Sequence, residues 1–143
     1  MAYAAQADLA PYIDSATVTL LTDDNKDGSA DAAVITGILG DVTARIDSAL
    51  KAAGYTTPVA VPGAALRSLA ARLCLATLYG RRPAVEAPPS ITTVAEAAEA
   101  ELKLIAAGKF QPPEAVRMSS PTGPGGIAIS SDATRDWADS ELF

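Results

Sequence analysis

One run of oxygen-bearing side chains has the spacing of a calcium-binding loop. Residues 23–31 read DDNKDGSAD, with oxygen ligands at positions one, three, five and nine and Gly28 at the turn. Calcium prefers carboxylate and amide oxygens arranged at such intervals. The spacing therefore predicts a cation site made of Asp23, Asn25, Asp27 and Asp31.

The same run has a second interpretation as an acidic loop that precedes a helix. Position twelve is Val34, where a calcium loop of this type carries a bidentate glutamate. Asp31 or Ser29 would then cap the helix, and the carboxylates would favour its positive end. Both interpretations stay open, so we expect no required cofactor, with a structural calcium ion as the alternative.

Few other residues in the chain could carry out catalysis. The sequence has no histidine, which excludes a Ser-His-Asp triad, a Cys-His pair and histidine-containing zinc sites. The one cysteine, Cys74, lies in an apolar run and is expected to be a small buried core residue. We therefore expect a protein that is not an enzyme.

The composition favours closely packed helices. Apolar residues make up 49% of the chain, much of it alanine, and only 5% is aromatic. The net charge is -6 and no long basic run occurs, so tight binding to DNA is not expected. No window has the ~20 apolar residues of a membrane span, and we expect a soluble protein without a membrane partner.

Hydrophobic periodicity predicts a long amphipathic helix over residues 31–53, ended by Gly54. A second helix, over residues 62–79, is apolar almost all round and should be enclosed by others. Pro62 would begin that helix and Gly80 would end it. Arg81 and Arg82 would follow the end of this helix. We expect their positive charge to complement the helix dipole, and this role is favoured over contact with DNA.

A third helix is predicted over residues 94–107, because Thr93 and Glu96 form a capping-box pattern after a Pro-Pro break. Residues 4–13 should form a short or broken helix, and residues 15–21 could be a strand or a short helix. The acid-first, four-residue spacing also predicts ion pairs within helices. These pairs are Asp41 with Arg45, Asp47 with Lys51, and Glu99 with Lys103.

From Gln111 onward the composition changes to proline and glycine without a helical period. The predicted organisation is a helical domain over residues 1–110 and an extended arm over residues 111–143. The fold class is all-α, a small bundle of about four to five helices with this C-terminal arm. Apolar residues in the arm should contact a partner, and the predicted partner-binding residues are Ile127, Ile129, Arg135, Trp137, Leu142 and Phe143.

Short motifs in order along almost the whole chain resemble the Mu-like head-tail connector, or adaptor, family of phages and prophages. They begin with Tyr3 and Ala7-Asp8-Leu9, continue with Leu20-Leu21-Thr22-Asp23 and the Asn25-Lys26-Asp27-Gly28 loop, and then with Ala44-Arg45-Ile46-Asp47 and Leu50. Later motifs are Ala71-Arg72-Leu73, Leu78-Tyr79-Gly80, Ile105-Ala106-Ala107-Gly108-Lys109, Ser119-Ser120-Pro121, and Thr134-Arg135-Asp136 before Phe143. Asn25 and Trp137-Ala138-Asp139 depart from the family pattern.

The resemblance implies a structural subunit without catalysis, located in the virion neck and in the host cytoplasm during assembly. It implies a dodecameric ring of copies of this chain beneath the portal protein. Head-closure or tail proteins would bind on the other side, and genome DNA would pass through the channel without specific binding.

Two other functions compete with this one. A different neck component, such as a head-closure or tail-terminator protein, would be β-rich. A calcium-responsive helical binding module would use the acidic loop for a calcium-dependent partner.

Overall fold

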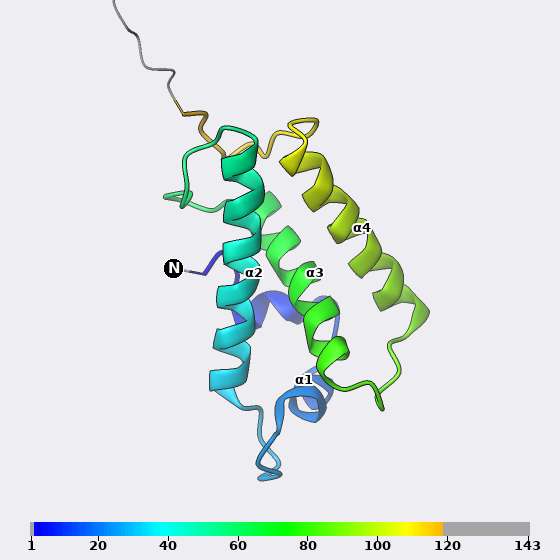
Figure 1. Cartoon of the computed structure of the whole chain (residues 1–143). Helices are drawn as coiled ribbons and strands as arrows, with labels where there is room; N and C mark the ends of the chain where they lie inside the picture. Colours follow the sequence, from blue (N-terminus) through cyan, green and yellow to red (C-terminus); the bar gives the residue numbers. More distant parts are fainter. Residues whose placement is uncertain (1, 119–143) are drawn as a thin grey trace, which may run out of the picture.

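Three long helices run alternately up and down and form the main body of the protein (Figure 1). They are α2 (Ala32–Ala52), α3 (Ala64–Arg81) and α4 (Pro89–Ala106). A 3₁₀ helix, η1 (Gln6–Leu9), and α1 (Ser15–Thr22) precede them and pack against α3. This computed structural model describes residues 2–118, and within that range the fold is the predicted small all-α bundle.

The central helix is α3, which contacts all four other helices. Its Leu66, Leu69, Leu73 and Leu78 are completely buried, as the all-round apolar pattern predicts. Cys74 is also fully buried, and burial raises the pKa of its thiol to about 11. The prediction of a core cysteine is therefore confirmed.

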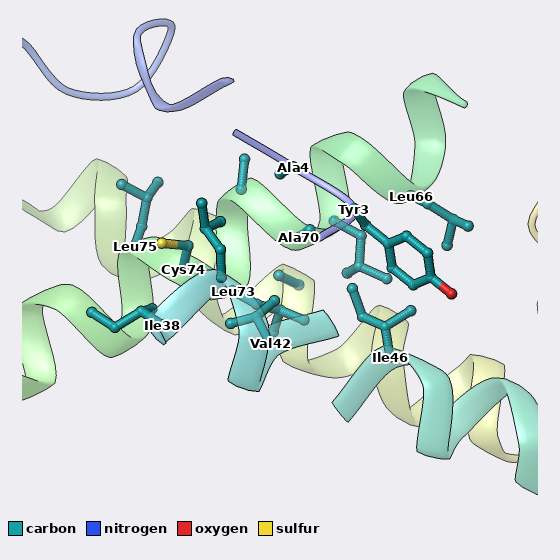
Figure 2. Packing of buried hydrophobic residues seen from close by; sticks show 14 of the residues in the cluster. Tyr3, Ala4, Ile38, Val42, Ile46, Leu66, Ala70, Leu73, Cys74 and Leu75 are labelled. Carbon is teal, nitrogen blue, oxygen red and sulfur yellow. The ribbon is translucent and has the colours of Figure 1, made fainter. Parts of the chain in front are cut away.

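The N-terminal segment is tied to α2 and to the α2–α3 loop by Tyr3. Its ring is buried among side chains of α2 and α3, close to Ile46 and Leu66 (Figure 2). The phenol O–H donates to Asp47 Oδ1 and accepts the backbone N–H of Val59 at 2.8 Å. Burial, followed by the hydrogen bond to Asp47, raises the pKa of Tyr3 to about 12.

The long amphipathic helix begins and ends as predicted. Asp31 is its N-cap residue, and its carboxylate accepts the N–H of Ala33 at 3.0 Å. At the other end Gly54 has a φ of 87°, a left-handed conformation that favours glycine. The acidic loop therefore passes at Asp31 into a helix whose two ends are both fixed by local contacts.

The predicted bounds of the second helix were wrong at both ends. α3 begins at Ala64, with Gly63 instead of Pro62 preceding it, and continues through Gly80 to Arg81. Glycine inside a helix lowers stability by only about 1 kcal/mol relative to alanine, and the packing of α3 offsets this loss. Gly80 therefore keeps a helical conformation. The enclosed surroundings of the helix thus override a residue that is a weak local stop signal.

The predicted capping box at Thr93 and Glu96 was also wrong. α4 begins at Pro89, and the Thr93 hydroxyl donates to the Pro89 carbonyl at 2.9 Å, inside the first turns. Proline suits the first helical position because it lacks the N–H that would be unpaired there. The Pro-Pro sequence is therefore the start of the helix and not a break before it.

The predicted ion pairs within helices are replaced by contacts between helices. Arg45 on α2 binds Glu99 on α4 through two hydrogen bonds, at 2.9 and 2.8 Å. Arg72 on α3 binds Glu101 on α4 at 2.6 Å, and Asp47 accepts from Tyr3. The two arginine contacts hold α4 on both of its neighbours, α2 and α3.

The N-terminal helices are short, as expected for a segment that contains Pro11. The 3₁₀ helix covers only Gln6–Leu9, which fits the prediction of a short or broken helix. Residues 15–21, for which strand and helix were both open, lie in α1. Asp14 caps that helix by accepting the N–H of Thr17 at 2.8 Å.

Replacing Tyr3 by phenylalanine should lower the free energy of unfolding by about 1–3 kcal/mol, because the buried N–H of Val59 loses its acceptor. Urea unfolding at neutral pH measures the change. The matched control is Tyr12→Phe, whose half-buried hydroxyl lies a long 3.4 Å from Ser68 Oγ. Equal losses in the two variants would contradict the role given to Tyr3.

The raised pKa also predicts how this contribution depends on pH. A neutral Tyr3 phenol favours the folded state, so its contribution is present below pH 10 and is lost as the pH rises toward 12. The difference in stability between the natural protein and Tyr3→Phe should therefore narrow across that range. A difference that stays constant up to pH 12 would contradict this assignment.

Candidate functional site

The acidic loop is organised by hydrogen bonds from its own backbone. Asp23 accepts the N–H of Asp27 at 3.0 Å and that of Gly28 at 2.9 Å. Asp27 in turn accepts the N–H and the hydroxyl of Ser29, and these bonds lower the pKa of the Asp27 carboxyl. Gly28 has a φ of 84°, a left-handed conformation that favours glycine at this turn.

A clamp from the end of α3 holds this loop. Arg81 and Arg82 bind the two carboxylate oxygens of Asp24 at 2.6 and 2.7 Å. They also donate to the backbone carbonyls of Leu21 and Asp23, at 2.9 and 3.0 Å. The Arg81 hydrogen bond is the main cause that lowers the pKa of Asp24. Both arginines therefore do more than complement the dipole of α3.

The structure separates the four predicted cation ligands by role. Asp23 and Asp27 bind backbone N–H groups of the loop, Asn25 accepts the N–H of Asp27 at 3.2 Å, and Asp31 caps α2. Within residues 2–118 no group of three or more acidic or cysteine side chains is placed to hold a metal. Calcium binding by this loop stays a prediction.

At the opposite end of the bundle, residues 111–118 lie along the loop between α2 and α3. The carbonyl of Val116 accepts the N–H of Thr56 at 2.7 Å, and the N–H of Met118 donates to Gly54 at 2.8 Å. The Arg117 guanidinium lies over the Tyr55 ring, 5.1 Å from its centroid. The beginning of the predicted arm is thus fixed to the helical domain.

Glu114 connects this segment to the start of α3. Its Oε1 accepts the N–H of Leu66 at 3.2 Å, and so supplies the cap that Gly63 cannot provide. A side chain at position 63 would collide with Glu114, since a Cβ there would lie 2.5 Å from Glu114 Cγ. Gly63 is needed for this close approach, which the sequence alone does not reveal.

A groove of 520 Å³ lies between α3 and α4. Leu75, Ala76, Tyr79 and Ile91 line its apolar part, and Glu96 and Lys103 lie on the α4 side. Small alanine side chains on both helices make the groove open and shallow, so it offers a contact surface more than an enclosed ligand site.

The six predicted partner-binding residues of the arm lie outside the described residues. They are Ile127, Ile129, Arg135, Trp137, Leu142 and Phe143. Their role as partner anchors stays a prediction. The segment that leads to them starts from the fixed position of Met118.

The described residues thus form a small helical bundle with the acidic loop held by Arg81 and Arg82 at one end and residues 111–118, here called the strap, fixed at the other. The sequence matches the family model described as Bacteriophage Mu, Gp36 over residues 3–129, and the chain therefore belongs to that family. No curated protein matches it. Membership indicates a phage protein with a structural or morphogenetic role, present in the virion or the infected cell.

None of the helices in the described part of the chain is both long and apolar enough to cross a membrane.

Removing the Asp24 carboxylate should loosen the acidic loop, because both ion pairs of the clamp are lost and only the arginine hydrogen bonds to the carbonyls of Leu21 and Asp23 remain. In Asp24→Ala, hydrogen exchange of backbone amides over residues 23–31 should become faster, while α2 and α4 stay protected. Asp41→Ala, an exposed change on α2, is the control. Because the pKa of Asp24 is lowered, acid should weaken the same clamp as the carboxyl becomes protonated below its usual range. Unchanged exchange in the loop would show that the clamp does not hold it.

The hydrogen bonds within the loop lead us to expect that it forms without calcium. The melting temperature of the protein should then be equal in a chelator and in millimolar calcium. A melting temperature that rises in calcium, with the rise lost in Asp23→Ala, would instead support a cation site in this loop that includes Asp23.

Proposed function

We propose that the chain is a structural head-tail adaptor subunit of a tailed phage, which forms a ring beneath the portal and links the capsid to the neck and tail. Membership of the Mu Gp36 family over residues 3–129 is the observation that carries the proposal. In this role the protein is not an enzyme, resides in the neck of the virion and is made in the host cytoplasm.

The surface of the helical domain supports assembly into a ring. The α3–α4 groove exposes apolar side chains, and further apolar side chains are exposed at the end where the strap lies. Exposed apolar patches on a small domain often mark contacts with other proteins. Neighbouring copies of the chain would cover these surfaces, with a dodecamer as the expected ring.

The predicted arm suits a role in binding the portal. Residues 111–118 are fixed on the domain, so each subunit presents the following segment from a defined position. Ile127 and Ile129 would add a short strand to a partner, and Trp137, Leu142 and Phe143 would be its anchors. Arg135 would contribute a charged contact beside them.

The charge of the chain suits passage of DNA through the ring. With a net charge of -6, a channel lined by carboxylates would repel phosphates, and the genome would pass without adhering. Head-closure or tail proteins would bind the face of the ring opposite the portal.

The competing functions receive less support. The bundle has no strand within residues 2–118, which does not favour a β-rich head-closure or tail-terminator protein. The acidic loop is held by Arg81 and Arg82 and by its own amides, so the structure adds no feature that favours a calcium-responsive module.

Mixing the purified protein with its cognate portal should give a ring stacked coaxially on the portal in electron micrographs. Deleting residues 132–143 should abolish this complex while the circular-dichroism spectrum stays helical. The control is Leu20→Ala, a change at an exposed side chain on α1 far from the strap. No association with a competent portal would overturn the adaptor role, and unchanged binding by the deletion variant would overturn the role of the arm.

A further inference from the structure

The groove between α3 and α4 carries two exposed charges of opposite sign on its α4 side. They are Glu96 and Lys103, and neither side chain forms an ion pair within residues 2–118. The other carboxylate that lines the groove, Glu99, is already bound to Arg45. Both charges are therefore available to a partner that docks on this groove.

The spacing of these two charges makes the surface complementary to itself. Residues seven apart on a helix lie on the same face, roughly 10 Å apart along its axis. If a second copy of α4 runs antiparallel to the first, with the midpoint between positions 99 and 100, Glu96 of each copy lies opposite Lys103 of the other. A parallel copy in register would instead bring like charges together. The charge pattern thus favours an antiparallel second copy as the partner.

The shape of the groove suits a second helix. Its floor is formed by the buried Leu75 and Ile91, and Tyr79 adds a partly exposed apolar ring. On the α4 side the lining includes Ala95 and Ala100, whose short side chains let another helix approach closely. α4 also lies at the edge of the bundle (Figure 1). A helix laid along this edge would remove the apolar part of the groove from water.

Glu99 lies at the centre of the same face, where an antiparallel pair brings its carboxylates from the two copies close together. Arg45 of the same chain holds each carboxylate through hydrogen bonds of 2.9 and 2.8 Å. The guanidinium offsets the negative charge, which reduces the repulsion between the two copies. The charges that determine the orientation are therefore Glu96 and Lys103.

The charges that flank α4 favour the same orientation. Glu86 is exposed shortly before the helix begins, and Lys109 is exposed shortly after it ends. An antiparallel pair brings the acidic flank of each α4 toward the basic flank of the other and aligns the two helix dipoles favourably.

We propose that a second copy of the chain docks on this groove with α4 antiparallel to α4, held by two reciprocal ion pairs between Glu96 and Lys103. The contact goes beyond the adaptor role, because such a two-fold contact is complete with two copies and does not repeat around a ring. In the free protein the pair covers the groove that neighbouring copies would cover in the ring. The pair therefore has to open before its subunits join the ring through this surface.

Sedimentation equilibrium of the full chain tests the pair. The molar mass should rise with protein concentration from that of one copy to that of two and stay there. Glu96→Lys and Lys103→Glu should each weaken pairing by at least about tenfold, because each change places like charges opposite one another at two positions. Asp41→Lys, an exposed change on α2 outside the groove, is the matched control and should leave pairing unchanged.

A mixture of the two weakened variants provides a sharper test. Equal amounts of Glu96→Lys and Lys103→Glu should pair with each other, because every lysine of one variant then faces a carboxylate of the other. The chain with both changes should likewise pair with itself. Circular dichroism of each variant checks that the helices are intact.

A natural chain that stays a monomer at millimolar concentration would overturn the proposal, as would helical single variants that fail to pair in the mixture. A mass that grows beyond two copies would indicate head-to-tail contacts and would overturn the two-fold arrangement. An equal loss of pairing in Asp41→Lys would overturn the assignment to Glu96 and Lys103. No portal is present, so these outcomes are separate from that of the portal experiment.

Discussion

The need to cover α3 on every side determines the rest of the structure. A helix whose Leu66, Leu69, Leu73 and Leu78 are all fully buried cannot lie at the surface of a small domain. α2 and α4 cover two sides, and η1 and α1 cover what remains, although both are too short to be stable alone. The N-terminal segment is therefore part of the core, and Tyr3 secures it by binding Asp47 and Val59 at once. Both ends of α3 then become positions where the chain must cross from one helix to another.

These two ends use the same physical solution with different residues. At its C-terminal end, Arg81 and Arg82 satisfy carbonyls of residues 21–23 and the Asp24 carboxylate. At its N-terminal end, Glu114 accepts the N–H of Leu66. In each case a charged side chain pairs with backbone groups that the helix or loop leaves unsatisfied, and the charge matches the helix dipole. The loop and the strap are consequently fixed to the central helix through its ends.

The sequence alone predicted a helix correctly where the residues that define the helix and its ends lie within the helix itself. The spacing of Ile35, Ile38, Val42 and Ile46 predicted α2, and Asp31 and Gly54 marked its ends. It was insufficient where the partner lies far along the chain. Arg45 has Asp41 one turn away on α2, but its Nη2 donates to both carboxylate oxygens of Glu99 on α4. The Asp24 clamp and the Glu114 cap join residues 57 and 48 positions apart, and no local pattern reports such contacts. Two helix bounds were predicted wrongly at Gly80 and Pro89. Packing in the bundle keeps Gly80 inside α3, and Pro89 is the first residue of α4 instead of part of a break before it.

The resulting molecule differs at its two ends in a way that matters for assembly. One end holds most of the loop carboxylates, with Asp24 neutralised by two arginines, whereas the other exposes Lys51, Lys109 and Arg117 around apolar side chains. Like charges repel, so two copies would bring unlike ends together, either head to tail or as an antiparallel pair. Head-to-tail contacts repeat around an axis and can close into a ring, whereas an antiparallel pair is a two-fold dimer. The charge distribution therefore agrees with the proposed ring but does not by itself select a ring over a dimer.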